Sequence, residues 1–298
     1  MDVLVSGSSG LIGTALVDTL RAGGHHAVRL VRGAGATAAP DAVAWDPVAG
    51  TIDAGALEGI DAVVHLAGAG IGDHRWTSAY RSTLVDSRVR PTDLLARALA
   101  GLTRRPSVLV SGSAIGYYGD RGDEELTEQS SIGTGFLPEL CQQWESATAP
   151  AEAAGIRVAR IRSGVVLSPR GGALRKQLPL FKFGLGGRFG SGRQWQSWIS
   201  IDDEVGAIIH LLTHELRGAV NLTAPTPVTN AEFTVALGRA LHRPTVLPIP
   251  RFGPALLLGR ELADNLLFSS ARVLPDALRA SGYVFRHATL AAAFADLL

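Results

Sequence analysis

The sequence predicts an α/β fold built on a doubly wound parallel sheet, and three observations support this prediction. Short apolar segments alternate with helical patterns from the N-terminus to about residue 162. The apolar segments are nearly continuous, as expected for strands covered on both faces, and residues 61–67 (DAVVHLA) are the strongest example. Hydrophobic residues make up 46% of the 298 residues and charged residues 18%, so the chain can fill a large core.

The first strand–helix–strand unit is the clearest. Residues 2–6 (DVLVS) predict a strand, and the helical pattern that follows begins near Leu11. Gly23-Gly24 end this helix, and residues 27–31 predict the next strand. A connection of this length favours a parallel pair of strands with a right-handed crossover.

The same alternation continues to Ser163 and predicts a Rossmann-type sheet. The other predicted strands of this region cover residues 43–45, 61–67, 107–111 and 157–162, and the predicted helices cover residues 78–100 and 136–154. Between them, residues 33–39 (GAGATAA) are predicted to form a mobile loop.

The pattern changes after Ser163. Residues 169–194 are rich in Gly and Arg with few strand signals, which indicates an insertion or a lid. Further predicted elements are strands at 198–201, 220–222 and 245–247, a helix beginning at Asp202, a helix over 231–241 capped by Thr229 and Glu232, and helices in the tail from 252 to 298.

A glycine motif joins the first strand to the first helix. It reads Gly7-x-x-Gly10-x-x-Gly13, and it lies between a strand and a helix as a dinucleotide-binding loop requires. Gly7 permits a tight turn, Gly10 lets the backbone approach a pyrophosphate, and Gly13 lets the helix pack closely on the strand. The predicted cofactor contacts in this loop are Gly7, Ser8, Ser9, Gly10, Leu11, Ile12 and Gly13.

The end of the second strand indicates which dinucleotide is bound. A carboxylate there would bond the ribose 2′-hydroxyl of NAD, but no Asp or Glu lies between Asp18 and Asp41. Arg29 and Arg32 lie near this edge instead, and an arginine suits the 2′-phosphate of NADP. We therefore predict NADP(H) as the cofactor, with Arg32 as the selecting residue.

Length and pattern together predict two regions. At about 150 residues per domain, the chain has room for two. Residues 1–165 are predicted to form the NADP-binding Rossmann domain, to which residues 196–222 return. Residues 166–195 and 223–298 are predicted to form a lid and a smaller C-terminal α/β region that binds the substrate.

Three further segments resemble the extended short-chain dehydrogenases/reductases of the NAD-dependent epimerase/dehydratase superfamily. His65-Leu66-Ala67-Gly68 resembles the turn on the adenine side, and Ser111-Gly112-Ser113-Ala114-Ile115-Gly116-Tyr117 resembles the strand that carries the catalytic serine. Residues 198–203 resemble the segment that returns the chain to the sheet. The resemblance implies cofactor contacts from Leu66, Ala67, Gly68 and Ser111, and places Ser113 at the catalytic serine.

The resemblance is closer to one atypical subfamily, the "epimerase family proteins" with a C-terminal domain of unknown function. Its marks are the segments His74-Arg75-Trp76-Thr77, Ser87-Arg88 and Gly116-Tyr117-Tyr118-Gly119, and the tail from Leu256 to Phe285. Ser87 and Arg88 stand where the superfamily keeps a helix asparagine, which implies that they contact the cofactor.

The catalytic pair of the superfamily, Tyr-x-x-x-Lys, has no counterpart in this chain. No tyrosine is followed by lysine four residues later, and aligning the helix by Glu145 puts Leu137 and Cys141 at the two positions. Tyr117 and Tyr118 lie just beyond the strand of Ser113, so either could donate a proton with the help of Ser113. The alternative is that both rings pack under the lid and Ser113 bonds only backbone.

Composition excludes several other classes of function. Lys+Arg 28 against Asp+Glu 27 gives a net charge of +1, which argues against a nucleic-acid or polyanion surface. The single cysteine excludes an intrachain disulfide and a multi-cysteine metal site, and His210 and His214 lack an evident third ligand, so we predict no metal. The N-terminus lacks a signal-peptide pattern and no apolar run is long enough to span a bilayer, so we expect a cytoplasmic protein with no membrane partner.

The sequence thus predicts an NADP(H)-dependent oxidoreductase or epimerase-like enzyme that acts on an unknown small molecule. The missing tyrosine–lysine pair leaves open a non-catalytic NADP-binding sensor or regulatory protein, or a structural partner with a permanently bound nucleotide. The substrate and the oligomeric state stay unknown.

Overall fold

The computed structural model describes residues 1–33 and 41–298, and the predicted loop at 33–39 therefore falls almost wholly outside the described residues. Its centre is an eight-stranded sheet in the order β12-β8-β6-β5-β1-β2-β3-β4, parallel except for β4. The strands are β1 (Asp2–Ser6), β2 (His26–Arg32), β3 (Ala42–Asp46), β4 (Thr51–Ile52), β5 (Ala62–His65), β6 (Val108–Ala114), β8 (Arg157–Ser163) and β12 (Gly218–Leu222). The predicted doubly wound Rossmann-type sheet is confirmed.

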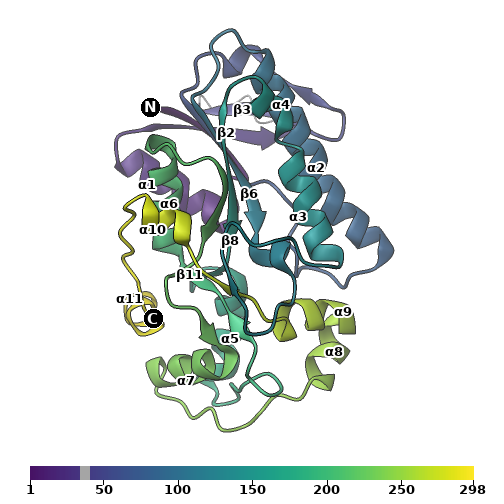
Figure 1. Ribbon diagram of the computed structural model, residues 1–298, viewed down its shortest axis with the longest axis vertical. Coiled ribbons are helices and arrows are strands. Elements are labelled where there is room, and N and C mark those ends of the chain that lie inside the picture. Colours follow the sequence, from purple (N-terminus) through teal and green to yellow (C-terminus); the bar gives the residue numbers. More distant parts are fainter. Residues whose placement is uncertain (34–40) are drawn as a thin grey trace.

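Helices cover both faces of this sheet (Figure 1). α1 (Leu11–Ala22) and α6 (Ile201–Thr213) pack on one face, and α2 (Ser78–Gly101), α3 (Phe136–Ser146) and α4 (Ala149–Ala153) cover the other. Successive strand residues accordingly enter different cores: Val3 and Val5 pack with α1 and α6, whereas Leu4 packs with α2. This alternation explains why the strands are apolar throughout.

The predicted helix over 136–154 is wrong in one respect, because it is two helices. α3 ends at Ser146 and α4 begins at Ala149. Pro150 has no N–H to give to the carbonyl of Ser146, and its ring clashes with a continuous helix. The Thr148 hydroxyl donates to the Glu145 carbonyl at 2.7 Å and satisfies part of the broken end.

The region after β8 differs more from the sequence prediction. Residues 169–194 contain α5 (Gly172–Lys182), which Pro179 and the flanking glycines obscure in the sequence. The predicted strand at 245–247 is wrong, since prolines at 244, 248 and 250 remove ladder donors and only Ile249 forms an isolated bridge, with Phe189. Residues 198–201 give β11 (Trp198–Ser200), which pairs with β9 (Val165–Leu167) outside the main sheet. β12 returns to the sheet as predicted.

The C-terminal part forms its own core around α5, Trp198, α7 and α11. The predicted capping box is confirmed, because Thr229 and Glu232 cap α7 reciprocally. The remaining elements are β7 (Glu125–Leu126), β10 (Trp195–Gln196), β13 (Val228–Thr229), α7 (Asn230–Ala240), α8 (Phe252–Leu258), α9 (Arg260–Ala263), the π-helical turn η4 (Asp264–Phe268), β14 (Arg272–Val273), α10 (Asp276–Ala280) and α11 (Leu290–Leu297), with short 3-10 turns η2 (Gly55–Leu57) and η3 (Ile115–Tyr118).

Candidate functional site

The loop between β1 and α1 has the backbone geometry that its glycines suggest. Gly7 has a φ of +66°, and a Cβ there would lie 2.7 Å from the carbonyl carbon of Leu66. A Cβ on Gly13 would lie 2.2 Å from the Gly7 oxygen, so only glycine lets α1 approach β1 this closely. No side chain caps α1 at Gly10, and the amides of its first turn stay available to an anion.

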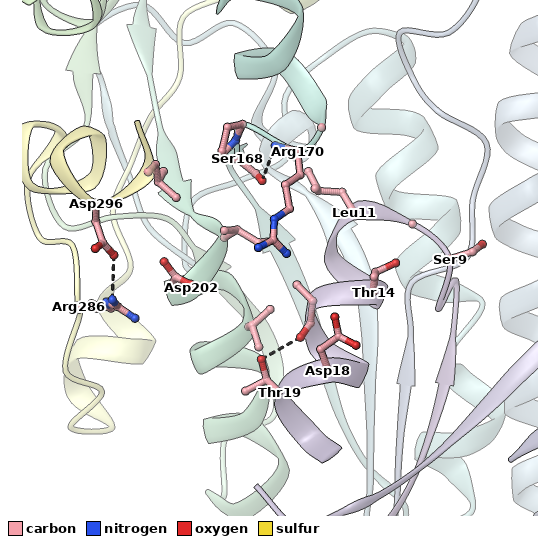
Figure 2. Close-up of a pocket in the computed structure, with 17 residues that line it drawn as sticks. Ser9, Leu11, Thr14, Asp18, Thr19, Ser168, Arg170, Asp202, Arg286 and Asp296 are labelled. Atoms are coloured by element: carbon pink, nitrogen blue, oxygen red, sulfur yellow. Dashed lines mark hydrogen bonds and ion pairs between the residues drawn. The ribbon is translucent and has the colours of Figure 1, made fainter. Parts of the chain in front are cut away.

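A cleft of about 680 Å³ opens from this loop between α1, α6 and residues 168–171 (Figure 2). Ser9, Gly10 and Leu11 form one end of it. The Arg170 side chain extends into the space between α1 and α6, and places a cation near the amide end of α1. The far wall carries the ion pair of Arg286 with Asp296, at 2.9 Å.

The two arginines at the end of β2 have different environments. Arg29 donates to Asp41 at 2.9 Å, and Arg21 pairs with the same carboxylate. The hydrogen bond from Arg29 lowers the pKa of Asp41 against the effect of burial. Arg32 lies at the carboxyl end of β2 with its side chain exposed. Arg29 therefore has a structural partner, and Arg32 is the arginine placed at the edge where a cofactor ribose would lie.

The segment after β5 is held by the residues that the sequence singled out. The Leu66 N–H donates to the Ser6 hydroxyl at 3.1 Å. The Ser87 hydroxyl accepts from the Ala69 N–H at 3.1 Å, and the Arg88 guanidinium donates to the Ala69 carbonyl at 2.9 Å. Ser87 and Arg88 thus position the Leu66–Ala69 backbone, and burial lowers the pKa of Arg88.

His65 forms a buried hydrogen-bonded link beneath this segment. Its Nδ1 lies 2.7 Å from the Ser6 hydroxyl and its Nε2 lies 3.0 Å from the Thr92 hydroxyl. Burial lowers the pKa of His65 to about 4, so the ring is neutral near pH 7. It is a satisfied core histidine, as its position in an apolar strand suggests.

The end of β6 and β8 holds a polar network around Ser113. The Ser113 hydroxyl donates to Glu145 Oε1 at 2.7 Å. Arg162 donates to both Glu145 oxygens, at 2.8 and 2.9 Å, and its side chain is only 5% exposed. Burial lowers the pKa of Arg162, but the bonds and charge of Glu145 raise it by more, so the guanidinium stays charged. Ser113 therefore does not bond only backbone.

The two tyrosines that follow Ser113 differ in their surroundings. Tyr118 is fully buried, its hydroxyl donates to Asn221 Oδ1 at 2.7 Å and it accepts from Arg162 at 3.1 Å. Burial raises the pKa of Tyr118. Tyr117 is only partly buried, and its ring lies 3.4 Å from the Arg162 guanidinium carbon. The Tyr118 hydroxyl thus already donates its hydrogen bond to another residue of the protein, whereas Tyr117 lies at the edge of the network.

Two other buried groups lie at this edge. The Ser111 hydroxyl has no hydrogen-bond partner among the residues that the structure describes. The Cys141 thiol donates to the Ala114 carbonyl at 3.7 Å, and burial together with the nearby Glu145 raises its pKa to about 12. Cys141 is therefore a protonated thiol, and it cannot supply the cation that a lysine supplies at this position.

His210 of α6 and His214, which follows this helix, have no third metal-ligating side chain beside them among the described residues. His210 and His214 stack at 3.5 Å, and His210 bonds the Ser281 hydroxyl. Over residues 1–33 and 41–298, the one group of three potential ligands is Asp202, His287 and Asp296. Asp296 is ion-paired with Arg286, so this group already has charge compensation.

Sequence reasoning missed Glu145 and Arg162 as parts of the site. Arg162 at the end of the strand predicted over 157–162 was the available signal, because a charge buried there needs a partner. Glu145 carried no such signal, since its position depends on how α3 folds back on the sheet. Among the described residues, no helix is both long and apolar enough to cross a bilayer.

Two family models match the chain. The NAD dependent epimerase/dehydratase family matches residues 3–223, and a domain of unknown function, DUF1731, matches residues 249–297. Both parts of the resemblance drawn from the sequence are therefore confirmed.

Similar proteins match over nearly the whole chain. Epimerase family protein Mb2239 of Mycobacterium bovis is 48% identical over 97% of this chain and 94% of its own. Human epimerase family protein SDR39U1 is 36% identical over all of both chains. The crystal structure of the human protein with NADPH superimposes with a TM-score of 0.91 at 34% identity, covering 100% of this chain and 99% of that one.

Other solved structures are similar at lower coverage or identity. A nucleoside-diphosphate sugar epimerase from Corynebacterium glutamicum gives a TM-score of 0.79 at 40% identity, covering 99% of this chain and 57% of that one. MoeE5 with UDP-glucose and NAD gives 0.74 at 20% identity, covering 100% of this chain and 97% of its own, and shares the fold.

Proposed function

The chain belongs to the NAD-dependent epimerase/dehydratase family, and we propose that it is an NADP(H)-dependent oxidoreductase or epimerase-like enzyme of that family, acting on a small molecule. The observation that carries the proposal is the Gly7–Gly13 loop, where the uncapped end of α1 meets the carboxyl edge of β1. This is where open α/β sheets bind a dinucleotide pyrophosphate.

The residues around the loop fit NADP(H). Arg32 at the end of β2 can pair with a 2′-phosphate, and no carboxylate of the described residues of β2 competes for a ribose hydroxyl. The unpaired Ser111 hydroxyl supplies a buried polar group at the same edge. The NADPH in the human relative's crystal structure supports the same choice of cofactor.

The polar network at β6 and β8 would carry the proton chemistry. A bound nicotinamide supplies or accepts a hydride. The Ser113 hydroxyl donates its hydrogen bond to Glu145, which also accepts from Arg162, so the lone pairs of the Ser113 oxygen are free to accept a hydrogen bond from a substrate hydroxyl. Tyr117 then remains as the candidate proton donor, because the Tyr118 hydroxyl already donates its hydrogen bond to Asn221.

A non-catalytic NADP(H) sensor is the second candidate. The observation that favours it is Cys141, a neutral buried thiol that leaves the site without the cation of the usual lysine. A sensor needs the loop and Arg32 but does not need Tyr117.

The test compares two variants by titration and turnover. Arg32→Ala should weaken NADPH binding by about 10- to 100-fold, the range of a lost charge-assisted bond, and leave NADH binding nearly unchanged, as followed by tryptophan fluorescence. Equal losses for both nucleotides would remove the assignment of Arg32.

A second experiment, a screen of carbonyl and sugar-nucleotide substrates for turnover, distinguishes the enzyme from the sensor. Turnover that Tyr117→Phe abolishes supports the enzyme. Binding without turnover across the panel supports the sensor.

A further inference from the structure

The exposed large hydrophobic side chains are concentrated at one end of the C-terminal region. Of the fourteen among the described residues, eight come from residues 180–185 and 246–257, which are eighteen residues of the chain. They are Leu180, Phe183, Leu185, Val246, Leu247, Phe252, Leu256 and Leu257. Such a concentration marks an interaction site rather than the usual scatter of exposed apolar residues.

The two segments lie side by side. Arg243 Nε donates to the Lys182 carbonyl at 2.8 Å, and the Ile249 N–H donates to the Arg188 carbonyl at 2.8 Å. The chain between α7 and α8 runs along the lower edge of the molecule and leads directly into α8 (Figure 1). We name residues 180–188 and 242–260 the basic apolar surface.

The charge of this surface is one-sided. It contains Lys182, Arg188, Arg243, Arg251 and Arg260 and no Asp or Glu, which gives +5, so the rest of the chain carries +1 − 5 = −4. Asp264, just outside it, pairs with Arg251 and lies 3.7 Å from Arg260. Lys182, Arg188 and Arg243 have no carboxylate partner among the described residues, so the small net charge of the whole chain hides a basic end.

The side chains project from the molecule rather than line a groove. Phe252, Leu256 and Leu257 of α8 are each 75% exposed, while Arg75 holds the end of α8 to the body through the Leu256 and Leu257 carbonyls. Projecting Phe and Leu side chains beside Lys and Arg are typical of a helix and loops that insert into the interface of an anionic bilayer.

We propose that the basic apolar surface docks the protein on the surface of an anionic phospholipid bilayer. A second copy of the chain is a poorer occupant, because a two-fold contact would bring the same cations together with no acid in the surface to pair them. The expectation of no membrane partner rested on the absence of a signal-peptide pattern and of a spanning segment, and neither bears on surface docking. The net charge of +1 argued against a polyanion surface, but that argument assumes an even distribution of charge.

The test uses the full chain and vesicle co-sedimentation. Wild type should bind phosphatidylcholine vesicles that contain phosphatidylglycerol, bind pure phosphatidylcholine at least about tenfold more weakly, and lose binding at high salt. Phe252→Ser with Leu256→Ser should reduce binding at least about tenfold, and Lys182→Glu with Arg243→Glu should reduce it to a similar extent. All variants should keep wild-type NADPH titrations, which confirms that they fold.

The control is Val48→Ser with Val284→Ser, which removes two equally exposed hydrophobic side chains elsewhere, 87% and 86% exposed, and should bind like wild type. The proposal is overturned by equal binding to both kinds of vesicle, by wild-type binding of the Phe252/Leu256 variant, or by a wild-type dimer in sedimentation velocity that this variant converts to monomer. None of these results depends on turnover, so they leave the proposed enzyme activity untouched.

Discussion

The carboxyl ends of β1 and β6 lie at the same edge of one sheet, but they are built in different ways. At β1 the loop works through backbone, since Gly7 and Gly13 leave space and α1 offers its amides. At β6 the site works through side chains, where Ser113, Glu145 and Arg162 bond one another. The comparison teaches that the β1 end has the glycine loop of a dinucleotide site, whereas the β6 end lacks the tyrosine–lysine pair that the family resemblance implies.

The largest effect is expected from adding one methyl group at the β1 end. An alanine Cβ at Gly13 would lie 2.2 Å from the Gly7 oxygen and 2.9 Å from the Ser8 Cα, both of them backbone atoms. Gly13→Ala should therefore displace α1, lower the free energy of unfolding by about 3 kcal/mol or more, and abolish NADPH binding. Urea unfolding and fluorescence titration measure the two effects.

Gly23→Ala is the matched control at the other end of α1. Its added Cβ would meet nothing closer than 3.4 Å and its φ is −80°, so stability and NADPH binding should stay close to wild type. If Gly13→Ala behaved like Gly23→Ala, the close approach of α1 to β1 would not be needed for binding.

At the β6 end, the next largest effect is expected from removing the partner of a buried charge. Glu145→Ala leaves Arg162, 5% exposed, without its carboxylate, and should cost about 3–5 kcal/mol in urea unfolding. The control is Glu152→Ala, which breaks the pair with Arg160 at the surface, where Glu152 is 52% exposed, and should cost about 0–1 kcal/mol. Similar losses would mean that Arg162 finds water or another partner.

The sequence predicted the β1 end better than the β6 end, because the interacting residues are closer along the chain at the β1 end. Gly10 and Gly13 are required by the backbone of Gly7, within seven residues, so a local motif predicted the nucleotide loop, although Gly7 itself also packs against Leu66. Ser113 reaches Glu145 across 32 residues, and Tyr118 reaches Asn221 across 103, so only the folded chain brings them together. For the same reason sequence could propose both Tyr117 and Tyr118 but could not distinguish them.

The strands and helices up to Ser163 were predicted because apolar alternation dominates there. The C-terminal region was predicted less well, because short elements such as β9 and α9 have too few residues for a period to be recognised. The capping box at Thr229 was the exception, since its signal lies in two residues and needs no period.

Glu204, in the first turn of α6 and bonded by Ser163 at the end of β8, contrasts with Glu145, because it is a buried carboxyl with no cationic partner among the described residues. Burial raises its pKa to about 8, against the bond from Ser163. The native state then holds a proton that the unfolded chain loses near the ordinary glutamate pKa of 4.5, so the contribution of Glu204 to stability falls as pH rises from about 4.5 to about 8. The sign is opposite to that of an ion-paired carboxylate.

Glu204→Gln keeps the shape of the side chain and removes the titration. Relative to wild type, its free energy of unfolding should rise by on the order of 3 kcal/mol between about pH 5 and about pH 8, measured by urea unfolding at several pH values. A constant difference across this range would show that Glu204 is ionised in the native state, and the raised pKa would be wrong.

The smallest effect is expected from two hydroxyl groups on neighbouring tyrosines, and it separates structure from chemistry at the β6 end. Tyr118→Phe removes the bonds to Asn221 and Arg162 from a buried site, and should cost about 1–2 kcal/mol in urea unfolding. Tyr117→Phe removes a hydroxyl that bonds no described residue, and should change stability by less than about 0.5 kcal/mol. If Tyr117→Phe lowered stability more than Tyr118→Phe, the Tyr117 hydroxyl would be the one held by hydrogen bonds within the protein. Tyr118 would then become the candidate proton donor.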